Sequence, residues 1–276
     1  MSTNNNTDLK IADLHGFELD QVIHGEALDV LRRIPADSFD SLVTDPPYCS
    51  GGTSAASRTG RSAAQKYVSS DSKSGHALPD FGGDTRDQRS FTIWCERWLS
   101  EALRVVRPGG SALVFTDWRQ LPALSDALQV AGWRWRGIVV WAKTNARPQT
   151  GGGFANASEY VLWASNGQPD RDHVPPFLPG VFTMGSPRGA ERKHITGKPV
   201  ELMRNLLRST PAGGKVLDPF AGSGTTGVAA IMEGRRFLGI EGSRDYAGVA
   251  RQRLAEARTA AEASDVYADL QAADAG

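Results

Sequence analysis

The 276-residue chain is 40% hydrophobic and 22% charged, a composition that is ordinary for a folded globular protein and excludes wholesale disorder. Its 31 basic and 31 acidic side chains balance to a net charge of zero, so any hold on a polyanion must come from local basic patches rather than from the average field. The two cysteines, Cys49 and Cys95, have no spacing typical of metal ligands, and we expect no metal.

Both ends of the chain are predicted to be tails. Residues 1–10 are polar and lack a signal-peptide pattern, and no segment approaches the roughly 18 apolar residues that cross a bilayer. We therefore expect a cytoplasmic protein with no membrane partner. Residues 258–276 are rich in Ala and acidic side chains without a strong apolar face. Residues 1–10 and 258–276 are thus predicted to be flexible, and one domain is expected over residues 11–254.

The first motif is Asp45-Pro46-Pro47-Tyr48, which directly follows a predicted buried strand, Ser38–Thr44. Its two prolines fix their backbone dihedrals and remove two N–H donors, so the segment leaves the sheet as a stiff turn. Such a turn can hold the Asp45 carboxylate and the Pro46 carbonyl as fixed hydrogen-bond acceptors, with the Tyr48 ring beside them. Ligands of open α/β sheets bind beyond the carboxyl ends of strands, which favours a site here over an ordinary loop.

Residues 49–90 come next and are rich in Gly, Ser and charged side chains. An irregular stretch of this length is uncommon in a compact domain unless it is functional or disordered. Arg58, Arg61 and Lys66 lie within it and are candidates to bind phosphate groups. The alternative is a solvated loop in which acidic side chains balance the basic ones.

Helices and strands alternate through the middle of the chain. The spacing of apolar residues predicts a helix over 91–106, a strand over 111–116, a helix over 121–131 and strands over 137–141 and 160–164. Arg147, between the last two strands, is a further candidate for contact with phosphates. The tryptophans that alternate along these strands are assigned to packing of the sheet rather than to a stacking platform: Trp133, Trp135, Trp141 and Trp163.

A second irregular segment covers residues 166–194 and is rich in Pro and Gly. It ends in basic side chains, of which Arg188, Arg192 and Lys193 are candidates to contact a polyanion. The apolar spacing after it predicts a helix over 200–209.

The second motif, VLDPFAGSGTT, spans Val216–Thr226. It combines most of a strand predicted over Lys215–Asp218, a glycine-containing turn and the start of a helix. Gly222 and Gly224 permit close approach of the backbone to a ligand, and the free N–H groups at the helix start suit a carboxylate or a phosphate. No lysine follows Gly224, so a Walker loop, and with it an ATPase, is disfavoured.

The next predicted strand, Arg236–Glu241, ends in an acidic residue. A carboxylate in this position can accept both hydroxyls of a ribose, so the second motif and Glu241 together predict a nucleoside site. Helices predicted over 225–233 and 246–257 complete an alternation that indicates a mostly parallel sheet covered on both faces. The ends of the two strands that precede Asp45 and Gly222 must then meet at one edge.

With both motifs present, the sequence resembles the DNA amino-methyltransferases, in particular the group whose catalytic motif precedes its cofactor motif. Asp45–Tyr48 is similar to the catalytic (D/N/S)PP(Y/F/W) signature and Asp218–Thr226 to the cofactor loop, with further similarity at Gly25–Leu28 and His194–Pro199. The resemblance covers His24–Leu254. It implies an α/β, Rossmann-like, seven-stranded, mostly parallel sheet with helices on both faces that ends in an antiparallel hairpin.

The resemblance implies S-adenosyl-L-methionine as the cofactor. It divides the domain into a catalytic half over about residues 20–165, a target-recognition segment over about 166–193 and a cofactor half over about 194–254. Glu26 stands where the family usually has Asp beside the cofactor adenine. The residues implied to bind the cofactor are Glu26, Ala27, Asp45, His194, Thr196, Lys198, Asp218, Phe220, Ala221, Gly222, Ser223, Gly224, Thr225, Thr226 and Glu241.

The implied activity is direct methyl transfer to the exocyclic amino group of a flipped DNA base. The adenine amino nitrogen is a poor nucleophile because its lone pair is delocalised, and two fixed acceptors on its hydrogens would stabilise the positive charge that develops there. Tyr48 would stack on the base and return roughly 1–3 of the few kcal/mol that flipping costs. The catalytic residues implied are Asp45, Pro46, Pro47 and Tyr48.

Adenine N6 is favoured because position 45 is Asp rather than Ser, and cytosine N4 is the nearest alternative. RNA is another candidate substrate, whereas C5 methylation is disfavoured because Cys49 lacks the Pro-Cys context of that nucleophile. A catalytically silent DNA-binding subunit is the alternative from another class, and the intact Asp45–Tyr48 motif argues against it. The partners implied are double-stranded DNA, methylated at a specific site, a second copy of the chain and a cognate restriction endonuclease.

Overall fold

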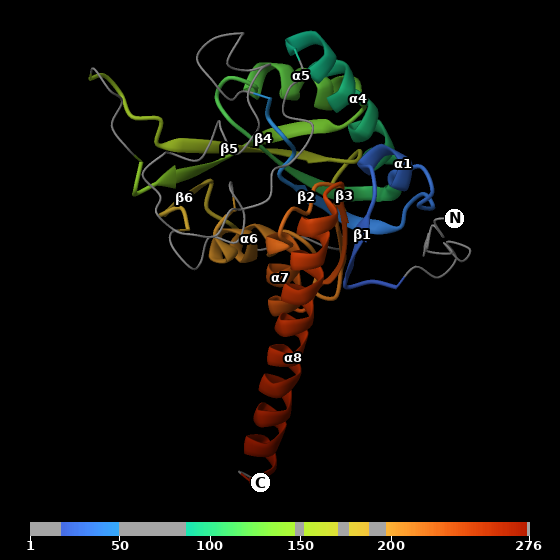
Figure 1. Ribbon diagram of the computed structural model, residues 1–276, viewed down its shortest axis with the longest axis vertical. Coiled ribbons are helices and arrows are strands. Elements are labelled where there is room, and N and C mark those ends of the chain that lie inside the picture. The colour runs from blue at the N-terminus through green and yellow to red at the C-terminus, as the bar shows by residue number, and fades with distance from the viewer. Residues whose placement is uncertain (1–17, 50–86, 147–151, 171–176, 188–196, 275–276) are drawn as a thin grey trace, which may run out of the picture.

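The computed structural model describes residues 18–49, 87–146, 152–170, 177–187 and 197–274, with side chains described as far as residue 263. Eight strands within these ranges form one sheet in the order β1-β8-β7-β2-β3-β5-β4-β6 (Figure 1). In chain order the strands are β1 (Gln21–His24), β2 (Phe39–Thr44), β3 (Val106–Thr116), β4 (Arg134–Lys143), β5 (Ser158–Ser165), β6 (Val181–Met184), β7 (Lys215–Asp218) and β8 (Arg236–Glu241).

The sheet is mostly parallel, as predicted. Strand β5 is antiparallel to both of its neighbours, β3 and β4, and every other neighbouring pair is parallel. The β4–β5 pair is the antiparallel hairpin that the resemblance implied. The sheet has one strand more than the seven implied, because β6 pairs with β4 and forms the edge. Its four residues are flanked by Pro and Gly, so no periodic pattern marked them.

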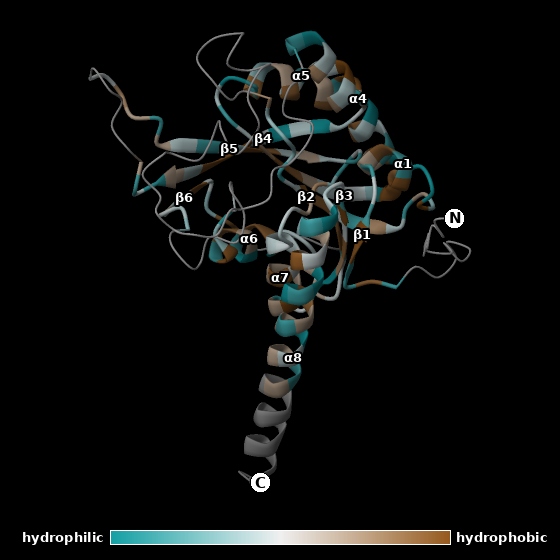
Figure 2. Ribbon diagram, viewed as in Figure 1, coloured by the Kyte–Doolittle hydropathy of each residue, from teal (hydrophilic) through white to brown (hydrophobic). Residues whose placement is uncertain are grey.

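Helices cover both faces of the sheet. They are α1 (Ala27–Leu31), α4 (Gln88–Val105), α5 (Leu121–Val130), α6 (Val200–Leu207), α7 (Thr225–Met232) and α8 (Arg244–Asp274). Adjacent residues of β2 show the two layers, since Leu42 packs with side chains of α1, α4 and α5, whereas Val43 packs with side chains of α6, α7 and α8. The apolar segments gather where these helices meet the sheet (Figure 2).

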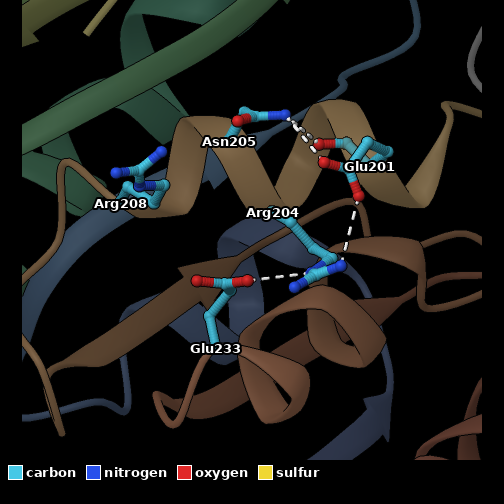
Figure 3. Close-up of a pocket in the computed structure, with 5 residues that line it drawn as sticks. All are labelled: Glu201, Arg204, Asn205, Arg208 and Glu233. Atoms are coloured by element: carbon cyan, nitrogen blue, oxygen red, sulfur yellow. Dashed lines mark hydrogen bonds and ion pairs between the residues drawn. The ribbon is translucent and has the colours of Figure 1, made fainter.

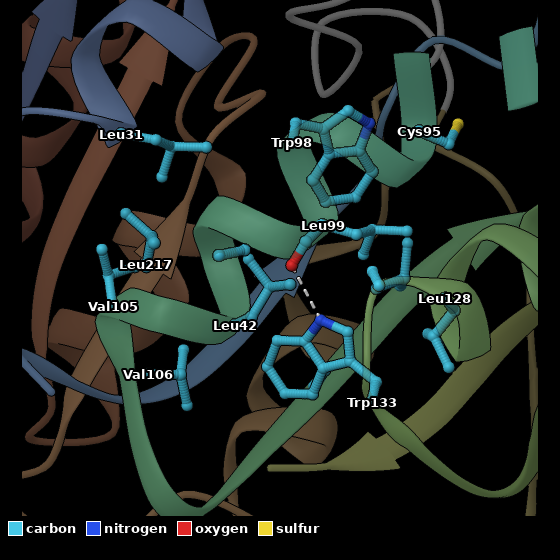
Figure 4. Close-up of a cluster of buried hydrophobic side chains, with 14 of the residues drawn as sticks. Leu31, Leu42, Cys95, Trp98, Leu99, Val105, Val106, Leu128, Trp133 and Leu217 are labelled. Atoms are coloured by element: carbon cyan, nitrogen blue, oxygen red, sulfur yellow. Dashed lines mark hydrogen bonds between the residues drawn. The ribbon is translucent and has the colours of Figure 1, made fainter. Parts of the chain in front are cut away.

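The core between α4, α5 and the sheet is built around large side chains (Figure 4). Trp98 is fully buried, and buried Trp133 donates a hydrogen bond from Nε1 to the carbonyl oxygen of Leu99 at 3.0 Å. Trp141 is also buried, but Trp135 and Trp163 are 40% and 42% exposed. The predicted role in packing is therefore confirmed for the buried Trp133 and Trp141, whereas Trp135 on β4 and Trp163 on β5 are only partly covered.

The structure of the C-terminal segment differs from the prediction. Residues 258–274, predicted as a tail, continue helix α8, which runs for 31 residues and extends away from the body of the molecule (Figure 1). Ala has the highest intrinsic helix propensity, and the segment is rich in Ala, so it forms a helix without the apolar face that we required. None of the helices within the described ranges is long and apolar enough to cross a membrane.

Candidate active site

The two motifs meet at one edge of the sheet. Strand β7 lies between β2 and β8 and is parallel to both, so the segments that follow Thr44 and Asp218 and the end of β8 at Glu241 are neighbours. The Thr44 hydroxyl donates a hydrogen bond of 2.6 Å to Asp218. This contact joins residues 174 positions apart and brings the Asp45 turn beside the glycine loop, as the sequence predicted.

The Asp45 carboxylate is half-buried and accepts hydrogen bonds on both oxygens. The Tyr48 hydroxyl donates to Oδ1 at 2.5 Å, and the Lys198 ammonium donates to Oδ2 at 2.5 Å. Burial raises the pKa of Asp45, and the charge of Lys198 only partly offsets it. Burial and the nearby Asp45 carboxylate raise the pKa of Tyr48 well above its ordinary value, so Tyr48 remains a hydroxyl donor.

Lys198 was predicted to bind the cofactor, and the structure places its ammonium between two carboxylates. It lies 2.5 Å from Asp45 and 3.2 Å from Glu159 Oε2, and close to the faces of the Tyr48 and Phe115 rings. Burial lowers the pKa of Lys198, but the two carboxylates outweigh it and leave the pKa above its ordinary value. Lys198 is therefore a cation within the site of the Asp45 turn.

Two members of this cluster, Glu159 and Lys143, were not among the predicted catalytic or cofactor-binding residues. Glu159 comes from β5 and forms an ion pair through Oε1 with Lys143 of the neighbouring strand β4. Burial alone would raise the pKa of Glu159, but Lys198 and Lys143 together hold it below its ordinary value. The sequence offered one signal for Glu159, because this acidic residue directly precedes the apolar strand predicted to begin at Tyr160.

The glycine loop is held in shape by two carboxylates. Asp218 accepts from the Thr226 hydroxyl at 2.6 Å and from the backbone N–H of Phe220 at 3.1 Å. Glu241 accepts from the backbone N–H of Gly222 at 2.8 Å. Gly224 has φ +80°, a left-handed conformation that favours glycine. The loop thus turns sharply between β7 and α7, with the Glu241 carboxylate against it.

A basic side chain that the sequence analysis left without a role secures the same loop. Arg253 of α8 donates from Nη1 to the carbonyl oxygen of Ser223 at 2.6 Å, and to the hydroxyls of Ser223 and Thr225 at 3.0 and 3.2 Å. Phe220 anchors the loop on its other side, where its ring packs on those of Trp94 and Trp98. Burial lowers the pKa of Arg253, although the group remains a cation.

Glu26 lies near the loop but has a structural partner of its own. Its carboxylate caps α1 by accepting from the backbone N–H groups of Leu28 and Asp29 at 2.7 and 3.2 Å. Gly25 donates to the carbonyl oxygen of Glu241 at 3.0 Å, so this cap and the buried Ala27 lie beside the end of β8. A role of Glu26 and Ala27 in cofactor binding stays a prediction.

Several predicted site residues lie outside the described ranges. These are the two cofactor candidates His194 and Thr196 and all the candidates for DNA contact, namely Arg58, Arg61, Lys66, Arg147, Arg188, Arg192 and Lys193.

The mostly parallel sheet, covered by helices on both faces, has the fold of the S-adenosylmethionine-dependent methyltransferases. Its glycine loop and acidic strand end lie beside the Asp-Pro-Pro-Tyr turn. The sequence profile of the DNA methylase family matches residues 39–178 and 177–252. The chain therefore belongs to the DNA methylase family. This confirms the expected enzyme class, with DNA as the substrate.

Individual proteins agree with this assignment. M2.DpnII, a type II methyltransferase of Streptococcus pneumoniae, is 29% identical over 251 residues, which cover 84% of this chain and 88% of the relative. The type II methyltransferase M.HinfI of Haemophilus influenzae is 30% identical over 258 residues, which cover 86% of this chain and 69% of the relative.

Solved structures share the fold. The complex of M1.HpyAVI with SAM has a TM-score of 0.60 at 24% identity, covering 85% of this chain and 98% of that chain. The cytosine-N4-specific PvuII DNA methyltransferase has a TM-score of 0.59 at 16% identity, covering 87% of this chain and 91% of that chain. At these identities the likeness concerns the fold alone, and it does not select the base.

Proposed function

We propose that this enzyme transfers a methyl group from S-adenosyl-L-methionine to N6 of adenine in double-stranded DNA, at a specific site and with the target base flipped out of the duplex. The observation that carries the proposal is the contact of 2.6 Å between Thr44 and Asp218. It sets the Asp45 carboxylate, a candidate acceptor for an amino group, beside the loop that is the candidate cofactor site.

The loop residues fit the proposed cofactor. The first turn of α7 has no side-chain cap, so its backbone N–H groups suit the carboxylate of the methionine part. Each Glu241 oxygen accepts one backbone N–H, from Gly222 and Ser243, and each keeps acceptor capacity for a ribose hydroxyl. When bound, S-adenosyl-L-methionine supplies an electrophilic methyl group.

The residues of the Asp45 turn act on the amino group. The Asp45 carboxylate accepts a hydrogen bond from the adenine amino group, and the Pro46 carbonyl oxygen accepts the second. Both acceptors place negative charge where the amino nitrogen becomes positive, and they are fixed before the reaction begins. The Tyr48 ring stacks on the flipped base. Asp at position 45 supports adenine over cytosine.

Product analysis tests the proposal directly. The purified enzyme is incubated with unmethylated DNA and S-adenosyl-L-methionine, and the digested nucleosides are identified by mass spectrometry. We expect N6-methyladenine, and N4-methylcytosine would overturn the choice of base. Asp45→Ala should abolish transfer while leaving cofactor binding, measured by calorimetry, largely intact. Unchanged turnover of Asp45→Ala would refute the role of this carboxylate.

The remaining partners are also proposals. The type II names of M2.DpnII and M.HinfI support methylation at a recognition site shared with a cognate restriction endonuclease. Sequencing of methylated positions in DNA from cells that express the enzyme identifies that site. A homodimer and a cytoplasmic location stay predictions from the sequence, and light scattering of the purified protein measures the first.

A further inference from the structure

The four charged groups around the Asp45 turn form an alternating chain. Lys198 lies between the carboxylates of Asp45 and Glu159, and Glu159 lies between the ammonium groups of Lys198 and Lys143. Two carboxylates and two ammonium groups balance in charge. The cluster as a whole is neutral, but the Lys198 ammonium lies closer to Asp45, at 2.5 Å, than to Glu159, at 3.2 Å.

This arrangement is unfavourable for a positive charge next to Asp45. Methyl transfer, as proposed above, places a developing positive charge on the amino nitrogen that Asp45 holds. An ammonium group on Oδ2 neutralises the carboxylate and repels that charge, and the Tyr48 hydroxyl occupies Oδ1. Each Asp45 oxygen keeps a further acceptor site, but the carboxylate stabilises the positive amino nitrogen most strongly when the Lys198 ammonium has moved away from it.

Glu159 is the acceptor within reach of both donors. Its Oε2 lies 3.2 Å from Lys198 Nζ and 3.3 Å from the Tyr48 hydroxyl. Its other oxygen, Oε1, is held by Lys143, whose ammonium also lies 4.9 Å from the centre of the Trp141 ring. Because Glu159 and Lys143 come from paired strands, β5 and β4, the carboxylate is held in place and Oε2 is directed at the Asp45 turn.

We propose that Glu159 is a positioning residue for methyl transfer: it takes up the Lys198 ammonium and the Tyr48 hydroxyl when the target amino group binds, and so frees the Asp45 carboxylate to hold that group. This inference rests on the proposed function, in which Asp45 binds the amino group. Glu159 would then be a second carboxylate of the site. It contacts Lys198 and Tyr48 rather than the base, and it acts through these two residues.

The test compares Glu159→Gln with a matched control in single-turnover methyl transfer at saturating DNA and cofactor. Gln keeps the shape but loses the charge, so we expect the rate to fall at least about tenfold, with the dissociation constant of the cofactor changed less than about twofold. The control is Glu233→Gln. Glu233 is as buried as Glu159, at 18% against 16% exposure, and pairs with Arg204 beside a pocket between α6 and α7 (Figure 3).

Glu233 follows α7 and precedes β8, so it lies at the opposite edge of the sheet and its variant should transfer at the rate of the wild type. A rate of Glu159→Gln equal to that of the control overturns the inference. Glu159→Asp keeps the charge on a shorter arm, so its rate should lie between those of the wild type and Glu159→Gln. A lower rate for Glu159→Asp than for Glu159→Gln also overturns it, because charge would then not be the decisive property.

A double-mutant cycle separates positioning from a merely structural role. If Glu159 acts largely through Lys198, Glu159→Gln in a Lys198→Met background should lower the rate much less than it does in the wild type. Equal effects in both backgrounds contradict the inference. Failure of the proposed function is distinguishable, because the wild type itself would then form no methylated amino group.

Discussion

Asp218 of the glycine loop accepts a hydrogen bond of 2.6 Å from Thr44, the residue immediately before Asp45. The same carboxylate accepts from Thr226 at the start of α7 and from the backbone of Phe220. A single buried group thus joins the strand that ends in the catalytic turn to both sides of the cofactor loop. Its ionisation should be measurable in the stability of the protein.

Stability is expected to depend on the charge of Asp218. Burial, only partly offset by the hydrogen bonds from Thr226 and Thr44, raises the pKa of Asp218 to about 6. The folded state therefore binds this proton more tightly than the unfolded state, whose pKa is about 3.9. The stabilisation that the protonated Asp218 gives the folded state is fully present below about pH 4 and is lost as pH rises through about 6. The free energy of unfolding should change by on the order of 2–3 kcal/mol over this range.

The measurement is urea unfolding of the wild type and of Asp218→Asn between about pH 4 and pH 7.5. The free energy of unfolding of the wild type, minus that of the variant, should fall as pH rises through this range. Taking the difference cancels the other titrating groups. A difference that stays constant with pH would contradict the raised pKa.

Most of the fold was predictable because its elements carry local patterns. The strands β7 and β8 begin and end at the predicted residues, since both are short apolar runs that follow glycine or charged turns. The short elements β1, α1 and β6 were missed because five residues or fewer give no measurable period. The four-residue strand β7 was predicted because a glycine-containing turn and the start of a helix follow it. The additional strand, β6, forms because it pairs with β4. The long helix α8 forms because of its intrinsic helix propensity. A pattern of apolar residues indicates neither cause.

The site was predictable where a motif lies at a strand end and unpredictable where contacts are distant in the chain. Asp45, Asp218 and Glu241 each follow or end a recognisable strand, and parallel strands share their carboxyl edge. Glu159 contacts Tyr48 across 111 positions, and Arg253 contacts Ser223 across 30. No spacing rule connects such pairs, so their partners emerge only from the folded chain.

The strap that Arg253 forms across the cofactor loop should control cofactor affinity. Arg253→Ala removes donors to Ser223 and Thr225, and a lost hydrogen bond from a charged group is worth about 1.5–3 kcal/mol. We expect the dissociation constant of S-adenosyl-L-methionine, measured by calorimetry, to rise about tenfold or more. Arg251→Ala is the matched control, because Arg251 lies in the same helix but donates to the carbonyl oxygen of Val22. Equal effects of the two variants would argue against a specific strap.

Trp133 and Trp135 offer a paired test of burial in the sheet. Each indole donates to a backbone carbonyl, Trp133 to Leu99 at 3.0 Å and Trp135 to Gly137 at 2.9 Å, but only Trp133 is buried. Trp133→Phe should lower the free energy of unfolding by about 1–3 kcal/mol, from the lost bond and the cavity. Trp135→Phe should change it by less than about 0.5 kcal/mol. Urea unfolding measures both, and similar losses would contradict the assigned difference.

One substitution at two glycines should change stability in opposite directions. Gly227 lies in α7 against β8, where an added Cβ would lie 2.6 Å from the Phe237 ring, and overpacking of this kind costs about 1–3 kcal/mol. Gly248 lies exposed in α8 with no atom within 4 Å of an added Cβ, so Ala gains up to about 1 kcal/mol from helix propensity alone. Gly227→Ala should therefore lower the unfolding midpoint, and Gly248→Ala should raise it. If Gly227→Ala also raised the midpoint, the close packing of α7 on β8 that fixes the cofactor loop would be looser than the structure has it.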